Sequence, residues 1–280
     1  MTKLIAIDIG HGSDTYKRTG GKGVVHNGKV YEEHTFNSAT AIELDKVLKY
    51  NGFKTVMYQQ PYSKEIGLTQ RTNYYNKIKV DLVWSIHANA GSHKANGACS
   101  FYWHTSEDGK KLAYLFAEEM NKAGYNTHGN GIHASERGSW TNMHICRETN
   151  MVAMLTENGF MTNPEEFKEI FLDPNYSKAM ARVHAKAICR YYGVMFKDTK
   201  PIPTPQPKTE IKKQGGNRML NLQDWQWEVI SDVLRDQHKD GILNSPDWEV
   251  RARNKELSVD ESILLIYATL GRNLDRLKGK

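Results

Sequence analysis

Two histidines and two glutamates in this chain have the residue types and surroundings needed for metal-assisted hydrolysis. His11 and His87 each follow an apolar stretch typical of a buried strand, Glu33 lies between them in the sequence, and Glu157 ends a further apolar stretch. Two imidazoles and one carboxylate are a common ligand set for catalytic zinc, which keeps a fourth position for water. An additional carboxylate nearby can take the proton of that water. The four residues together predict a metal-dependent hydrolase.

Each of these residues also has a purely structural explanation. A histidine between two glycines, as His11 is, commonly belongs to a loop, and His87 fits a buried histidine with satisfied hydrogen bonds equally well. Glu33 stands beside Glu32 ahead of a helical segment, where the helix dipole favours acidic residues. Glu157 is harder to explain without a function, because a carboxylate directly after an apolar strand is costly to bury without a cation.

The segments that must position these residues alternate between strand and helix patterns. Short apolar runs predict strands at residues 4–9, 53–58, 82–87, 99–103 and 152–156. Apolar residues at helical spacing predict helices at residues 35–50, 107–123 and 176–192. This alternation predicts an α/β fold with a largely parallel or mixed sheet flanked by helices, and a site outside the ends of the strands.

A proline-rich segment divides the chain. Residues 201–207 contain four prolines and a Lys-, Gln- and Gly-rich stretch follows, so residues 197–217 are predicted to form an extended linker. A catalytic domain is therefore expected over residues 1–196. The spacing of apolar residues from Trp225 and a capping-box pattern at residues 258–261 predict a small all-helical module over residues 218–280. Because about sixty residues give only a marginal core, self-association as a homodimer would help to stabilise it.

Composition and charge exclude several functions. The net charge of +6 comes from residues 1–217 and suits an anionic polymer such as a cell wall, but no basic cluster interleaved with aromatic residues indicates nucleic-acid binding. Cys99, Cys146 and Cys189 are too scattered for a disulfide framework, which predicts three reduced, mostly buried thiols. The apolar stretches are too short for a signal-peptide core or a membrane span, so we expect synthesis in the cytoplasm and no membrane insertion.

In combination, the motifs resemble the zinc-dependent N-acetylmuramoyl-L-alanine amidases of the amidase-3 family, over about residues 1–193. The shared features follow the family's order and spacing: the glycine-flanked His11, the step from Glu33 to Asn37, Ser-Ile-His-Ala-Asn at 85–89, Thr-Glu-Asn-Gly-Phe-Met-Thr-Asn at 156–163, Arg71 and Arg137. Two positions depart from the pattern, because Ser13 replaces the second glycine of the opening motif and Met151 stands where a proline is common. Neither position is a ligand.

The resemblance implies roles for the four residues and a reaction. His11, Glu33 and His87 would bind one Zn²⁺ ion, and Glu157 would be the catalytic carboxylate. Glu33 is preferred over Glu32 because the family's ligand precedes an asparagine by four positions, and only Glu33 does so here. The implied substrate is peptidoglycan, cleaved by zinc-activated water at the amide between N-acetylmuramic acid and the L-alanine of the stem peptide.

The C-terminal module weakly resembles extensions of phage-type lysins from Gram-positive hosts. The resemblance therefore implies an endolysin that acts on the wall after release through a holin-type pore or cell lysis, with a host autolysin as a close variant. The module would be a device for wall binding or self-association. Within it, Trp225, Trp227 and Trp248 are either core residues or part of a carbohydrate-binding surface; the core interpretation is favoured for Trp225, and Trp227 fits the apolar face less well.

Several other residues are candidates for substrate contact. The Gly-, Ser- and Asn-rich stretch at residues 124–142 is predicted to form one wall of a cleft, and Trp140 within it is suited either to packing or to stacking on a sugar ring. The candidates are His144, Arg71, Arg137, Asn89 and His133. The remaining histidines, including His34 and His184, are expected at the surface or on helix faces.

Two alternative functions use the same residues. A non-catalytic wall-binding protein on an amidase fold would be expected to have lost at least one of the four site groups, and all four are present. A zinc deacetylase or carboxypeptidase could use a similar ligand set, and only the order of the motifs argues against it.

Overall fold

The structure is a computed structural model that describes residues 2–198 together with residues 227, 230–231, 234–235, 247–255 and 257. The chain divides into two compact units, Met1–Ile202 and Pro203–Lys280, each of which is described by itself. All four residues predicted to do chemistry belong to the first unit.

A six-stranded sheet forms the centre of the first unit, in the order β4-β1-β5-β8-β6-β7. Its strands are β1 (Leu4–Ile9), β4 (Lys54–Val56), β5 (Leu82–Asn89), β6 (Ala98–Trp103), β7 (Thr127–Ser135) and β8 (Val152–Phe160). β6 runs antiparallel to β8 and the other neighbouring pairs are parallel, so the predicted mixed, largely parallel sheet is confirmed. Because β1, β5 and β8 are parallel neighbours, their carboxyl ends meet at one edge of the sheet.

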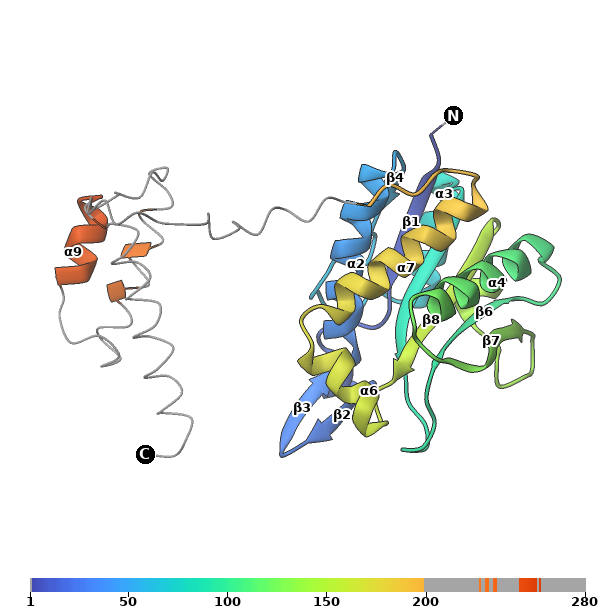
Figure 1. The fold of residues 1–280 in the computed structure, drawn as a ribbon, viewed down its shortest axis with the longest axis horizontal. Coiled ribbons are helices and arrows are strands. Elements are labelled where there is room, and N and C mark those ends of the chain that lie inside the picture. The colour runs from blue at the N-terminus through green and yellow to red at the C-terminus, as the bar shows by residue number, and fades with distance from the viewer. Residues whose placement is uncertain are drawn as a thin grey trace. The chain divides into compact units, whose positions relative to one another are not determined.

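Helices cover both faces of this sheet, as the strand and helix patterns predict. α2 (Glu33–Tyr50), α4 (Glu107–Lys122) and α7 (Tyr176–Tyr191) lie on one face and enclose the larger apolar core (Figure 1). α3 (Leu68–Ile78) and α5 (His144–Arg147) cover part of the other face, over a smaller core. The shorter elements are α1 (Thr15–Thr19), β2 (Gly23–His26), β3 (Lys29–Glu32), α6 (Pro164–Phe167) and the π-helix η1 (Lys168–Leu172). All three cysteines are buried and free, as predicted.

Some elements differ from those that the sequence predicts. β7 occupies part of the stretch at residues 124–142, whose composition indicates a loop, and Gly129 and Gly131 give it two residues with positive φ. The hairpin of β2 and β3 has strands of only four residues, too short for a clear alternating pattern. β5 and β8 extend past the predicted ends, so His87 is not the last residue of its strand and Glu157 lies within a strand and not after it.

The second unit contains the helix α9 (Asp247–Arg253). Trp227 is only 3% exposed and packs in a small buried cluster with Leu234, Ala252 and Leu257, so for this residue the carbohydrate-surface interpretation is wrong. Trp248 is partly buried, with the Arg251 guanidinium 5.4 Å from the centre of its ring. Trp225, the predicted capping box and most of the predicted linker lie outside the described residues. Within the described part of the chain, no helix combines the length and the apolar character that crossing a membrane requires.

Candidate active site and metal centre

Glu33 brings the two candidate histidine ligands together. Its Oε2 lies 3.1 Å from His11 Nε2, and its Oε1 lies 2.9 Å from His87 Nδ1. One ligand atom from each of the three residues falls within 4.8 Å of the others. Glu33 is the first residue of α2 and is 2% exposed, whereas Glu32 precedes the helix and is half-buried. The structure therefore assembles the predicted group with Glu33 as its carboxylate.

The ends of β1 and β5 place the two imidazoles next to each other. His11 adopts a positive φ of 61°, and its ring centre lies 4.8 Å from that of His87. Between the two strands, Gly10 donates its N–H to the carbonyl oxygen of Ile86 at 3.1 Å. A Cβ atom at Gly10 would lie 2.4 Å from His87 Cε1, so only glycine lets the His87 ring occupy this place.

Further hydrogen bonds orient the Glu33 carboxylate. The Asn37 side chain, one turn along α2, and the backbone N–H of Ala88 both donate to Oε1 at 3.2 Å. Burial opposes the charged form, but the His11 and His87 imidazoles outweigh it and hold the pKa of Glu33 well below its usual range. Glu33 is therefore an ionised carboxylate, as a metal ligand must be.

Glu157 lies beside this group on the neighbouring strand. It is the register partner of His87 in the β5–β8 pair, so the two side chains point to the same face of the sheet. Burial, followed by the charge of Glu33, raises the pKa of Glu157 well above its usual range. A carboxylate with a raised pKa can both accept and return a proton, which is the behaviour required of a general base.

Two buried polar atoms indicate that the group is built to hold something more. Among the described residues, Glu157 Oε2 is buried without a hydrogen-bond partner, and the buried His11 Nε2 has only its ion-pair contact with Glu33 Oε2 at 3.1 Å. Unpaired buried polar atoms are costly, so they usually serve a function. Two imidazole nitrogens and a carboxylate oxygen are the donor set of many catalytic zinc sites, and these residues fit such an ion.

Comparison with known proteins agrees with this geometry. The model of the Amidase_3 family, described as N-acetylmuramoyl-L-alanine amidase, matches residues 5–190. The chain belongs to this family. The amidase CwlM of Bacillus licheniformis is 31% identical over 200 residues, which cover 69% of this chain and 70% of that protein. This chain is therefore an N-acetylmuramoyl-L-alanine amidase that acts on peptidoglycan.

Solved structures show the same fold. The catalytic domain of the amidase CwlV from Bacillus (Paenibacillus) polymyxa var. colistinus is 30% identical, with a TM-score of 0.58, over 69% of this chain and all of that domain. An N-acetylmuramoyl-L-alanine amidase from Clostridium difficile 630 is 26% identical, with a TM-score of 0.58, over 69% of this chain and 97% of that one.

Arg71 of the amidase is buried and pairs with Asp8 near the end of β1. It is 1% exposed and donates to both carboxylate oxygens of Asp8, at 3.0 and 3.1 Å, and to the carbonyl oxygen of Ile9 at 3.1 Å. Asp8 also accepts hydrogen bonds from Tyr75 and Ser85. This buried pair contradicts the prediction that Arg71 binds substrate, and it fixes the end of β1 just before His11. In the sequence, the only indication of this buried ion pair is the charged residue Asp8 inside an otherwise apolar strand.

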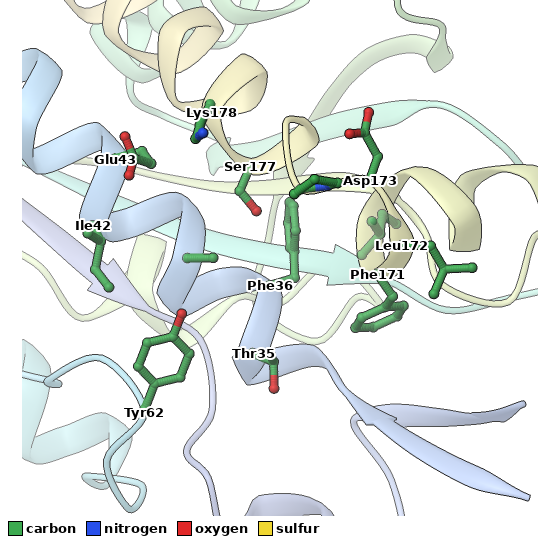
Figure 2. A pocket seen from close by; sticks show the side chains of 13 residues that line it. Thr35, Phe36, Ile42, Glu43, Tyr62, Phe171, Leu172, Asp173, Ser177 and Lys178 are labelled. Carbon is green, nitrogen blue, oxygen red and sulfur yellow. The ribbon is translucent and has the colours of Figure 1, made fainter. Parts of the chain in front are cut away.

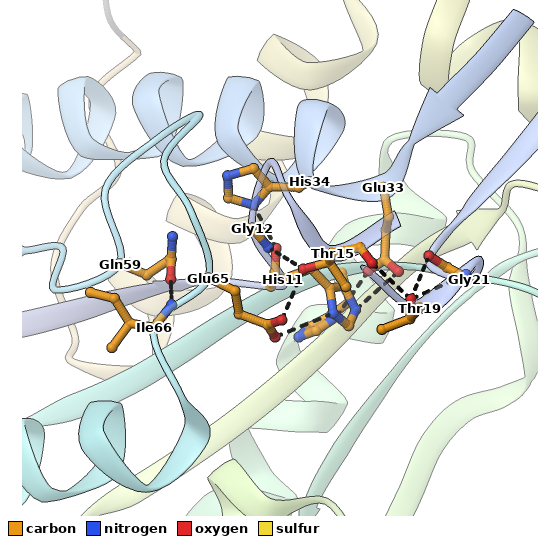
Figure 3. A network of polar contacts seen from close by, with 12 residues as sticks. His11, Gly12, Thr15, Thr19, Gly21, Glu33, His34, Gln59, Glu65 and Ile66 are labelled. Atoms are coloured by element: carbon orange, nitrogen blue, oxygen red, sulfur yellow. Dashed lines mark hydrogen bonds and ion pairs between the residues drawn. The ribbon is translucent and has the colours of Figure 1, made fainter. Parts of the chain in front are cut away.

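A second network of polar contacts, centred on Glu65, lies near the Nδ1 atom of His11. Glu65 Oε1 lies 4.0 Å from His11 Nδ1, and its Oε2 accepts hydrogen bonds from Thr15 at 2.9 Å and from Arg18 (Figure 3). Thr15 Oγ1 in turn accepts from the backbone N–H of Gly12 at 2.9 Å. The sequence motifs do not identify Glu65, because it comes from a loop that only the fold brings near His11.

The remaining candidates have different surroundings. His144 and Asn89 are half-buried: His144 Nε2 lies 3.3 Å from Thr72 Oγ1, and Asn89 Oδ1 accepts from the next backbone N–H. Arg137 is exposed, with its guanidinium 3.9 Å from a Glu148 oxygen. These positions leave their side chains available near the surface.

Three aromatic rings pack together in a cluster that we call the aromatic patch: Phe101 is buried, His133 is half-buried and Trp140 is exposed. The His133 ring stacks on Phe101, at 5.2 Å between ring centres. Trp140 packs edge-on against both and is 77% exposed. Phe101 lies two residues along β6 from Cys99, the register partner of Glu157, so Phe101 points to the same face of the sheet as Glu157.

Two of the histidines expected at the surface or on helix faces lie on helices, and both of them are buried. His34 Nδ1 lies 2.8 Å from the carbonyl oxygen of Gly10, and His184 lies between Trp84 and Asn158. Both positions lie on helices whose apolar residues face the core, and a histidine can join that core when other polar groups satisfy its two nitrogens. The sequences of α2 and α7 do not show which groups from other elements will hydrogen-bond to these two histidines.

A separate pocket lies between α2 and the segment that joins η1 to α7 (Figure 2). Phe36, Ile42 and Tyr62 form part of its lining, with the charged residues Glu43 and Lys178 also at its wall. None of the four site residues lines it. It is therefore distinct from the catalytic centre.

Proposed function

We propose that this amidase is zinc-dependent, with His11, Glu33 and His87 as the metal ligands and Glu157 as the general base. The observation that carries the proposal is the convergence of two imidazoles on one ionised buried carboxylate, with a second buried carboxylate beside them. No purely structural explanation accounts for four such groups at one edge of the sheet, because their burial is costly without a cation.

The chemistry divides between the ion and the protein. Zinc, when bound, polarises the scissile carbonyl and lowers the pKa of water toward neutrality. Glu157 accepts the proton of the attacking water and delivers it to the nitrogen of the leaving L-alanine. Glu33 balances the charge of the site, while the Asp8–Arg71 pair fixes β1.

We propose that the substrate reaches Glu157 along the face that carries the aromatic patch. Trp140 offers a flat exposed ring for stacking, and the half-buried His133 ring packs against it. Arg137, His144 and Asn89 are proposed as further contacts with the muramoyl-peptide. Aromatic faces with a few polar groups are typical of binding sites for amphipathic ligands.

Metal analysis combined with product analysis tests this function. We expect about one zinc per chain, clearing of purified Gram-positive walls that a chelator abolishes, and new amino groups on L-alanine. Release of acetate would instead indicate a deacetylase, and release of terminal D-alanine a carboxypeptidase. Absence of both zinc and clearing would favour the non-catalytic wall-binding protein.

For the second unit we propose wall binding in a phage-type endolysin, with self-association as the alternative role. The proposal rests on its separation from the catalytic unit and on the weak resemblance to lysin extensions. Deletion of residues 218–280 should preserve activity on soluble muramoyl-peptides and weaken sedimentation with intact walls. Unchanged wall binding together with conversion of a dimer to a monomer would identify a homodimerisation module. Action on the wall after release by lysis remains part of this proposal.

A further inference from the structure

Three buried side chains connect α7 and the centre of the sheet to the backbone of a proposed zinc ligand. Trp84 Nε1 donates to His184 Nδ1 at 3.2 Å, and His184 Nε2 lies 2.7 Å from Asn158 Oδ1. Asn158 Nδ2 donates to the carbonyl oxygen of His87 at 2.9 Å. We call this chain of hydrogen bonds the His184 relay.

The direction of every hydrogen bond in the relay is determined. An indole N–H can only donate, so His184 Nδ1 is the acceptor and the ring proton is on Nε2. His184 Nε2 therefore donates to Asn158, which orients the Asn158 amide with its nitrogen toward His87. The second amide hydrogen of Asn158 is donated to Thr156 Oγ1 at 3.3 Å. The side chain of Asn158 thus has one satisfied orientation.

The relay acts where the sheet is irregular. The register of β5 and β8 pairs His87 with Glu157 and then Asn89 with Phe160, so two residues of β8, Asn158 and Gly159, lie opposite one residue of β5. Gly159 has a φ of 101°. Such a bulge disrupts the ladder locally, and here the Asn158 side chain supplies a hydrogen bond to the His87 carbonyl.

α7 also holds the other side of this bulge. The Tyr176 hydroxyl, at the start of α7, donates to the backbone carbonyl of Asn158 at 2.8 Å, and His184 is eight residues further along the same helix. Asn158 directly follows Glu157. The helix is therefore bonded to the residue that directly follows the proposed base and donates a hydrogen bond to the proposed ligand.

We propose that His184 and Asn158 are positioning residues that fix His87 and Glu157 relative to each other. Neither reaches the reacting atoms, since both act through the backbone of the bulge. Misplacement of a catalytic group by about 1 Å can cost 10²-fold in rate, and loss of an outer hydrogen bond to a metal ligand typically costs about 10–100-fold in metal affinity or activity. This inference rests on the proposed zinc function.

Variants at His184 test the relay. His184→Leu removes both hydrogen bonds of the ring and frees the Asn158 amide to rotate, whereas His184→Gln retains an amide N–H that can donate to Asn158. Ile188→Ala is the matched control, because Ile188 is fully buried on α7 but lies outside the relay. The measurements are kcat and KM on muramoyl-peptides and the zinc dissociation constant from competition with a chromophoric chelator.

We expect His184→Leu to lower kcat and to raise the zinc dissociation constant by about tenfold each, with KM within twofold of the wild-type value. His184→Gln should recover most of both losses, and Ile188→Ala should change neither. If His184→Leu does not fold, Asn158→Ser, which shortens the side chain and removes the bond to His87, should show the same losses.

Two results separate this inference from the function on which it rests. If the wild-type protein binds zinc and the folded relay variants match Ile188→Ala in kcat and zinc affinity, the relay has only a structural role and the inference is overturned. If the wild-type protein binds no zinc at all, the proposed function itself fails.

Discussion

His87 and Glu157 are register partners on two neighbouring parallel strands, β5 and β8. One is a proposed metal ligand and the other is the proposed general base. Their separation is therefore set by the spacing of adjacent strands, about 4.8 Å, and not by a loop. Catalytic groups held by strands are placed more reproducibly than groups held by loops, which suits a reaction that needs a base next to a metal.

Glu157→Gln should leave the fold and the zinc content unchanged and lower kcat by about 10²–10⁴-fold, because the amide keeps the size of the side chain but cannot accept a proton. The rate of L-alanine amino-group release from purified walls measures the loss, and metal analysis of the same sample provides the control. Activity within tenfold of the wild type would remove Glu157 from the base role.

Glu33→Gln and Glu32→Gln form a matched pair of adjacent variants. Glu33→Gln should weaken zinc binding by at least about 10-fold, since a neutral amide is a poor ligand where an ionised carboxylate is required. Glu32→Gln should not affect zinc binding, because Glu32 lies outside the ligand group. Chelator competition on both proteins decides the matter, and equal losses would contradict the assignment of Glu33.

Arg71→Met should destabilise the catalytic unit by about 3–5 kcal/mol, because it leaves the buried Asp8 carboxylate without its cation. Urea denaturation measures this loss. The double variant Asp8→Asn/Arg71→Met should recover part of the stability, since it removes the unpaired charge. An increase in KM at unchanged stability would show that Arg71 contacts substrate after all.

The stability of the catalytic unit should depend on pH through His184. Burial lowers the pKa of His184 from 6.5 to about 3 in the folded protein. A folded-state pKa below the unfolded-state value gives a stabilising contribution that is complete above pH 6.5 and is lost as the pH falls toward 3. Between pH 8 and pH 5 the loss is about 2 kcal/mol. Urea denaturation of the metal-free protein should show this loss, and His184→Gln should lack it; parallel pH profiles would contradict it.

Trp140→Ala should raise KM for muramoyl-peptides by about 2–10-fold with kcat unchanged, the effect of losing one stacking contact of about 0.5–1.5 kcal/mol. Tyr114→Ala is a suitable control, because Tyr114 is also an exposed aromatic residue but lies on α4, which covers the opposite face of the sheet. Equal effects of the two substitutions would indicate that the aromatic patch does not bind substrate.

The central elements of the fold follow from local patterns in the sequence. β1 is a short apolar run with clear limits, and α2, α4 and α7 have apolar residues at helical spacing, so their ranges are predicted to within a few residues. β7 contains glycines and polar residues throughout and pairs only with β6, so its strand character depends on a partner that the local sequence does not reveal.

The candidate site, like the fold, can be predicted from the sequence only where its residues belong to local patterns. His11 lies just past the end of β1, Glu33 starts α2, and His87 and Glu157 lie near the ends of β5 and β8, while the resemblance to the amidases gives their order. Asp8, Glu65 and the His184 relay depend on contacts between distant segments, such as His184 with Trp84, 100 residues earlier. No periodicity or motif encodes such pairings, which is why Arg71 looks like a binding residue in the sequence and is a buried ion-pair partner in the structure.

The order of the strands has a consequence for when lytic activity can arise during synthesis. β8 lies between β5 and β6, although both are translated before it. A nascent chain that stops before residue 152 lacks the strand that joins the two halves of the sheet, and it also lacks Glu157. The ribosome must therefore complete β8 before the sheet can close and before Glu157 can join His11, Glu33 and His87.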